Sequence, residues 1–160
     1  MTDPQDSLVK AAVAGLVEVG SGQLSLADVI GLDRQVLELM LDKALGLAKF
    51  GKLDDAAAEL ERLSLVDAHW PLAPLALGAV RAEQRRFEPA VAAYREAEAR
   101  AARLGAPTIE GKASLCRGHA HVALGDGESA RDALRRAIEL GEPLIRETAA
   151  QLLSVVEGPR

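Results

Sequence analysis

LGAVRAEQRRFEPAVAAYREA, residues 77–97, carries three spaced positions that set the architecture of the whole chain. The small residue Gly78 is followed twelve residues later by Ala90 and, four beyond that, by the larger Tyr94. Two other segments repeat this small, small, large spacing, at Ala44, Ala56 and Leu60 and at Gly118, Ala130 and Leu134. Two antiparallel helices approach closely only where small residues meet, so each segment predicts one helix pair.

The interval between the segments identifies the repeat. Ala44 and Gly78 are 34 residues apart, which is the period of the tetratricopeptide repeat, a helix–turn–helix unit. Gly78 and Gly118 are 40 residues apart, so about six residues are inserted, and we expect them around residues 105–108. The larger third residue of each segment is expected to fill the gap between successive repeats.

The pattern predicts an all-α tetratricopeptide-repeat solenoid of three helix pairs with N- and C-terminal capping helices. The repeats occupy residues 36–142, as pairs over about 37–70, 71–104 and 111–142. Residues 1–35 form an N-terminal helical cap, in which Ser7 caps a helix from Leu8 to about Val17 and a short helix covers residues 24–30. Residues 143–160 form a C-terminal capping helix and tail, with Pro143 opening the helix.

Composition excludes several classes of function. The net charge is −5, basic and acidic residues are interleaved, and only 2% of residues are aromatic, so no nucleic-acid partner is expected. The longest uncharged run, residues 68–80, contains two prolines and is too short to cross a bilayer, so no membrane insertion is expected. A single cysteine, Cys116, and an acidic rather than basic start favour a cytoplasmic protein.

No pattern of catalytic or ligand-binding residues is found. Cys116 and His119 could place two metal ligands on one helix face, but no further pair completes a site. The glycines at 125 and 127 lack the strand and the Gly-Lys-Ser/Thr ending of a phosphate-binding loop. No nucleophile is paired with a base. The sequence therefore predicts a non-enzymatic protein without cofactor or metal.

The first helix of each pair lines the concave face of such a solenoid. Glu38 and Lys112 fall on this face, and its remaining positions form a mostly aliphatic groove: Leu41, Leu45, Ala48, Leu72, Leu75, Ala79, Ala82, Leu115, His119 and Val122. We expect the groove leucines to point away from the inter-helix core and to bind an extended peptide with apolar anchors. Alternatively, a flanking helix folds into the groove. Only Lys112 and Lys49 could serve as a clamp for a peptide carboxylate, which argues against that role.

The chain also resembles the class II type III secretion chaperones, the cytoplasmic chaperones of translocator proteins. The similarity covers roughly residues 16–140 and is carried by residues 20–26, 36–40, 51–56, 63–79, 86–94 and 120–130. The chain departs from that family by having Leu41, Leu45, Ala48 and Leu53 where the family tends to place aromatic residues, and by the inserted residues before the third repeat.

The resemblance implies a peptide-binding chaperone for a secreted or translocator protein. The alternative hypothesis is a permanent scaffold or adaptor subunit of a multiprotein complex. A weak homodimer is also predicted, because the N-terminal helix presents a broad apolar face: Leu8, Val9, Ala12, Val13, Leu16 and Val17. The alternative for this helix is that it packs wholly on the first repeat.

Overall fold

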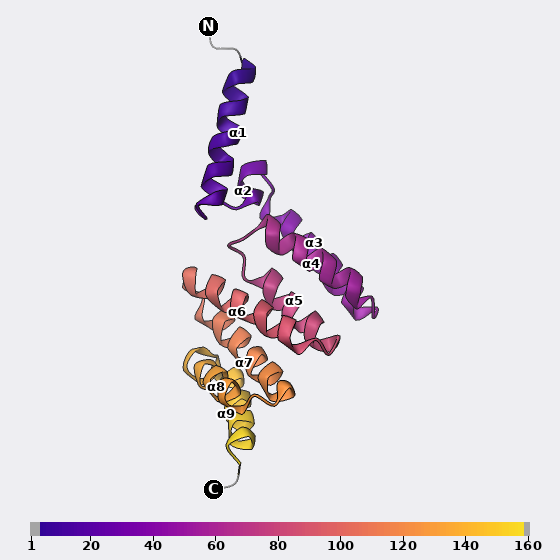
Figure 1. Cartoon of the computed structure of the whole chain (residues 1–160), viewed down its shortest axis with the longest axis vertical. Helices are drawn as coiled ribbons and strands as arrows, with labels where there is room; N and C mark the ends of the chain where they lie inside the picture. Colours follow the sequence, from indigo (N-terminus) through magenta and orange to yellow (C-terminus); the bar gives the residue numbers. More distant parts are fainter. Residues whose placement is uncertain (1–3, 159–160) are drawn as a thin grey trace.

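The computed structural model describes the backbone of residues 4–158 and the side chains of residues 10–158. The described chain contains nine helices and no strand (Figure 1), which confirms the all-α class. The helices are α1 Pro4–Gly20, α2 Leu26–Ile30, α3 Arg34–Lys49, α4 Leu53–Val66, α5 Leu72–Glu83, α6 Phe87–Arg103, α7 Pro107–Leu124, α8 Gly127–Leu140 and α9 Pro143–Glu157.

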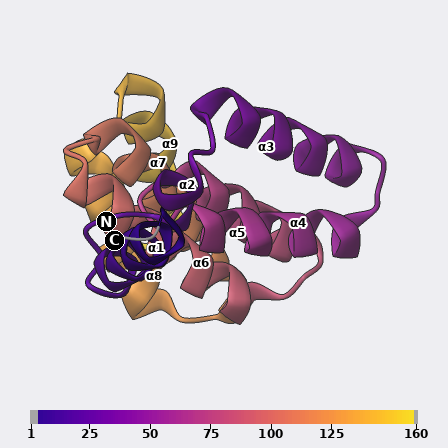
Figure 2. The same cartoon turned by 90° about the horizontal axis from the view of Figure 1, so that it is seen from above.

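The helices from α3 to α9 form one continuous stack (Figures 1 and 2). Three antiparallel pairs, α3–α4, α5–α6 and α7–α8, pack one on the next, and α9 packs against α8 and α7. Each helix touches mainly its neighbours in the chain, as expected of a solenoid. The first helices of the pairs, α3, α5 and α7, are themselves in contact along the stack, α3 with α5 and α5 with α7.

The small anchor residues lie where the helices of a pair approach most closely. A Cβ atom added to Gly78 would lie 2.5 Å from the ring of Tyr94, and one added to Gly118 would lie 2.7 Å from Leu134. The large third residue therefore lies over the small first residue of its own pair. Tyr94 also packs with Ala120 of the third repeat, so it fills the gap between repeats as well.

Substitution of this anchor provides a test of the packing. Gly78→Ala is expected to destabilise the fold by about 1–3 kcal/mol, because the new methyl group overlaps the buried ring of Tyr94 and the ring or the helix must shift to admit it. The matched control is Gly46→Ala in α3, where nothing lies within 4 Å of the added Cβ, and where alanine should stabilise the helix by about 1 kcal/mol. Urea denaturation of both variants measures the difference, and equal changes would contradict this packing.

The residues inserted between the second and third repeats lengthen two helices and do not form a separate loop. α6 has 17 residues where α4 has 14, and α7 has 18 where α5 has 12. Only the short turn at residues 104–106 separates α6 from α7, and Gly105 adopts a positive φ of 62° there. The expected position at 105–108 is thus the junction of two extended helices.

The N-terminal segment differs from its prediction. Ser7 lies inside α1, which begins at Pro4, so the prediction that Ser7 caps a helix from Leu8 is wrong. The side-chain cap belongs instead to Ser25, which forms a capping box with Asp28 at the start of α2. Within the described chain α1 contacts α2 alone, so it does not pack on the first repeat. The short α2 covers the end of the stack, where Ala27 is buried with Leu37.

The turn between α4 and α5 is held by a buried arginine from α6. Arg100 donates hydrogen bonds to the backbone carbonyls of Asp67 at 2.8 Å and of Trp70 and Ser64, both at 3.2 Å. The Asp67 carboxylate accepts hydrogen bonds from backbone N–H groups within the same turn and pairs with Arg34 at 3.1 Å. This network fixes the position of α5 relative to α4, and α5 lies at the centre of the concave face.

Candidate functional site: an apolar groove on the concave face

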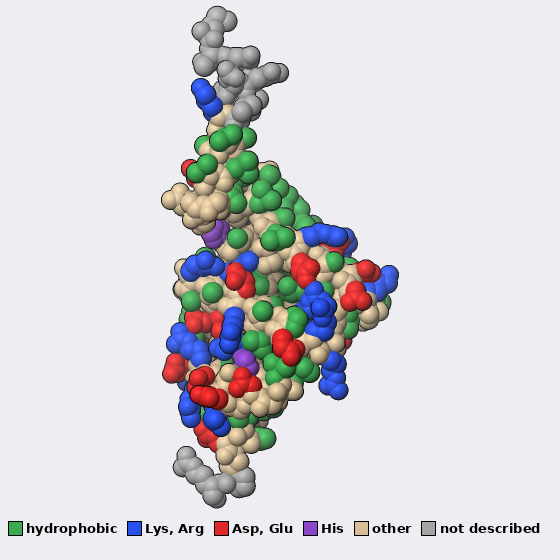
Figure 3. All heavy atoms as spheres, viewed as in Figure 1, with side chains coloured by type: hydrophobic (Ala, Val, Ile, Leu, Met, Phe, Trp, Pro, Cys, Tyr) green, Lys and Arg blue, Asp and Glu red, His purple; other side chains and the backbone are tan. Residues whose placement is uncertain are grey.

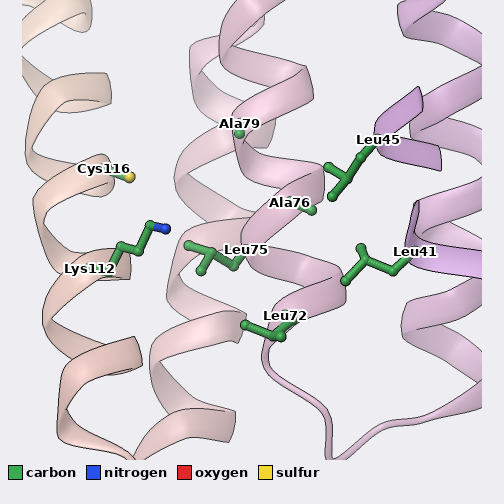
Figure 4. A pocket seen from close by; sticks show the side chains of 8 residues that line it. All are labelled: Leu41, Leu45, Leu72, Leu75, Ala76, Ala79, Lys112 and Cys116. Carbon is green, nitrogen blue, oxygen red and sulfur yellow. The ribbon is translucent and has the colours of Figure 1, made fainter. Parts of the chain in front are cut away.

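An apolar pocket of about 300 Å³ lies between α3, α5 and α7. Figure 4 shows two leucines reaching in from α3, a row of apolar side chains along α5, and Lys112 extending from α7 toward Leu75. The lining residues are Leu41, Leu45, Leu72, Leu75, Ala76, Ala79, Lys112 and Cys116. The volume and the apolar lining are those of a ligand pocket, with a single charged group at its edge.

Five of the ten predicted groove residues line this pocket: Leu41, Leu45, Leu72, Leu75 and Ala79. Leu115 lines a second pocket, which lies between α7 and α9, and Ala82 and His119 line a third pocket with Phe87 and Tyr94. Ala48 packs half-buried against the core of the first repeat, and Val122 is exposed; neither lines any of the three. The predicted face is therefore divided among three pockets.

Sequence reasoning missed two residues of the pocket, Ala76 and Cys116. Each lies two positions before the small anchor of its repeat, Gly78 or Gly118, and so both occupy the same register position. The repeat spacing was the signal that could have found them. The equivalent position in the first repeat is Asp42, which is exposed.

The expectation that the groove leucines point away from the core is wrong for most of them. Leu75 is half-buried and packs against the cluster that contains Ala90 and Tyr94. Leu41 and Leu72 likewise pack against buried residues of the first two repeats. Leu45 differs, because it is 43% exposed. Because α5 packs between α4 and α6, its groove leucines Leu72 and Leu75 lie partly against the core and partly in the groove.

Cys116 borders all three pockets of the concave face. Burial raises the pKa of its thiol, and the positive charge of Lys112 opposes this change only in part. The thiol is therefore protonated near neutral pH and is a poor nucleophile. The described side chains contain no group of three potential metal ligands.

The two histidines of α7 have different environments. His119 is exposed and lines a pocket, whereas His121 is buried, with its Nδ1 3.4 Å from Oδ2 of Asp126. Burial lowers the pKa of His121, and the nearby Asp126 carboxylate partly offsets this effect. His121 is thus neutral at physiological pH and belongs to the packing of the third repeat.

Three stacked helix pairs with an apolar groove along their first helices define a tetratricopeptide-repeat solenoid. No described helix is both long and apolar enough to cross a membrane. Neither the family models nor the curated proteins compared with the sequence give a match.

Solved structures, in contrast, share the fold over nearly their whole length. A chain of a type III secretion complex from Aeromonas hydrophila has a TM-score of 0.77 at 23% identity, covering 90% of this chain and 95% of that one. PcrH of Pseudomonas aeruginosa, bound to the chaperone-binding region of PopD, has a TM-score of 0.71 at 23% identity, covering 79% of this chain and 95% of that one. The translocator chaperone SycD of Yersinia enterocolitica has a TM-score of 0.71 at 20% identity, covering 84% of this chain and 97% of that one. The structural neighbours thus include the type III secretion translocator chaperone SycD, and they also include tetratricopeptide-repeat proteins such as Spaghetti, whose first repeat domain is bound to an HSP90 peptide; the likeness establishes the fold.

Proposed function

We propose that this protein is a cytoplasmic chaperone that holds an extended apolar segment of a secreted or translocator protein of a type III secretion system. The observation that carries the proposal is the apolar pocket formed by Leu41, Leu45, Leu72 and Leu75 on the concave face. The fold shared with the translocator chaperone SycD, and with PcrH bound to the chaperone-binding region of PopD, supports it.

The physical chemistry of the groove suits a holding function. An aggregation-prone segment exposes apolar side chains, and their transfer from water into this pocket is favourable by about 25 cal/mol for each Å² buried. The groove is open, and its walls come from three separate helices, so an extended peptide can enter from the side. Among the eight residues that line the apolar pocket, only Lys112 and Cys116 are titratable, and the Cys116 thiol is protonated near neutral pH.

Cys116 provides the test, because it is the only cysteine and lines the pocket. The protein is first used to capture its client from the native cell, and mass spectrometry identifies what is bound. Addition of the purified client is then expected to slow alkylation of Cys116 at alkaline pH about tenfold or more, because a bound chain excludes the reagent from the groove. An unchanged alkylation rate in the saturated complex would place the client on another surface.

A permanent adaptor is the second candidate function. Hydrophobic side chains lie on the surface of α1 (Figure 3), and they favour this function. Among them Val13, Leu16 and Val17 are 54%, 58% and 65% exposed. An exposed apolar helix surface of this kind suits a permanent protein–protein interface. The two functions predict different compositions of the assembled secretion apparatus. A chaperone releases its client and is missing from the apparatus, whereas an adaptor remains in it.

The same surface leads to the prediction of a weak homodimer through the N-terminal region. The side chains of Leu8 and Val9 lie outside the described residues, and the described part of the face, Ala12, Val13, Leu16 and Val17, is exposed. Pairing of two copies would bury this apolar area. Light scattering over a range of concentrations should show a dimer that Leu16→Glu disrupts and that the control Val155→Glu, at the far end of the molecule, leaves intact. A concentration-independent monomer would rule out the dimer.

A further inference from the structure

The concave groove continues beyond the three repeats onto the C-terminal helix. A pocket of about 420 Å³ lies between α7 and α9, and it shares Lys112 and Cys116 with the apolar pocket described above. The two pockets are therefore adjacent and meet at these two side chains. The other lining residues of the second pocket are Thr108, Leu115, Glu142, Leu144, Ile145 and Thr148.

The position of α9 follows from an unusually close approach of two backbones. A Cβ atom added to Gly111 of α7 would lie 2.7 Å from the backbone nitrogen of Gly141, in the turn before α9. Glycine at this position allows the turn to lie directly on α7, which brings the first turn of α9 beside Lys112. Leu144, in this first turn, lines the second pocket and is 74% exposed.

The charges of the groove are arranged asymmetrically. Lys112 alone is charged among the eight described residues that line the first pocket, and it forms no ion pair with another described side chain. In the second pocket the added charge is Glu142, whose Oε1 accepts a hydrogen bond from Thr108 at 3.5 Å. The Lys112 cation thus lies where the two pockets meet, and the Glu142 carboxylate adds a negative charge to the second pocket.

We propose that one extended polypeptide segment occupies both pockets, with an apolar side chain in each and an acidic residue between them facing Lys112. The proposal rests on the proposed function and specifies the segment that the groove selects. An unpaired ammonium beside apolar surface favours a carboxylate in the bound chain and discriminates against a basic residue at the same place. Glu142 disfavours a second acidic residue at the α9 end, so the acidic residue is central and not terminal.

A displayed library of random peptides of about twelve residues, which span roughly 40 Å when extended, tests the selection. The wild-type protein is expected to enrich peptides that have an aspartate or glutamate with one apolar residue before it and one after it. The Lys112→Glu variant should instead enrich lysine or arginine at the central position. Its affinity for the best wild-type peptide should fall roughly tenfold at low salt and less at high salt, as the affinity of an exposed charge pair does.

The second pocket is tested with Leu144→Glu, and Val155→Glu is the matched control on the same helix with the same 74% exposure. Leu144→Glu should lower the affinity for the selected peptide at least tenfold, while Val155→Glu leaves this affinity unchanged. Both variants should keep the melting temperature of the wild type. Equal effects of the two substitutions would overturn the role of the α9 pocket. The role of Lys112 would be overturned if the enriched apolar peptides show no preferred charge at the central position. It would also be overturned if the wild type and Lys112→Glu select the same central charge. Failure to enrich any apolar peptide would overturn the proposed function itself.

Discussion

Leu45→Glu is expected to abolish client binding while leaving the melting temperature within a few degrees of the wild type. Leu45 is 43% exposed and projects from α3 into the groove, so the folded protein can keep a carboxylate there in water (Figure 4). In the complex the same carboxylate would be buried against apolar client side chains at a cost of several kcal/mol. A micromolar complex has only about 8 kcal/mol of binding free energy, so the affinity should become undetectable.

The measurement pairs thermal unfolding with titration of the captured client. Leu39→Glu is the control on the same helix, because Leu39 is 67% exposed and lines none of the three groove pockets. Leu75→Glu, in contrast, should lose both binding and stability, since Leu75 also packs against the cluster containing Ala90 and Tyr94. A Leu45→Glu variant that is folded and binds normally would refute binding in the concave groove.

Arg100→Leu should lower the free energy of unfolding by about 3–5 kcal/mol, the range found when one member of a buried charged network is removed. Arg100 is only 6% exposed, and its guanidinium donates to three backbone carbonyls at the end of α4 and in the following turn. Leucine fills part of the space, but those carbonyls lose a charged donor in a region that water does not reach freely.

Arg103→Leu is the matched control, because Arg103 lies one turn further along α6, its side chain is 62% exposed and its ion pair with Glu96 is 4.0 Å long. An exposed pair of this kind contributes less than about 1 kcal/mol. Urea denaturation at neutral pH gives both values. If the two variants lose similar stability, the turn is held by the Asp67 network and the helix packing without a large contribution from Arg100.

The repeat architecture could be predicted because its contacts are local and periodic. Ala44, Gly78 and Gly118 recur at the register where helices of a pair meet, and a solenoid needs contacts only between neighbouring units. The same register defined the concave face, which is why five predicted residues line the apolar pocket. Ala76 and Cys116 were missed because the face was assigned from four positions of each repeat, although a wide groove uses the adjacent position too.

The sequence alone thus determined the helical class, the pairing of helices and the aliphatic character of the groove, since each depends on residues at fixed spacings within one repeat. The tertiary structure decided features that join distant or irregular segments. Arg100 reaches carbonyls some thirty residues earlier in the chain, and Gly111 admits the Gly141 turn, which extends the groove onto α9. No periodicity encodes such contacts, because they depend on how far two helix axes approach and on which side chains leave room between them.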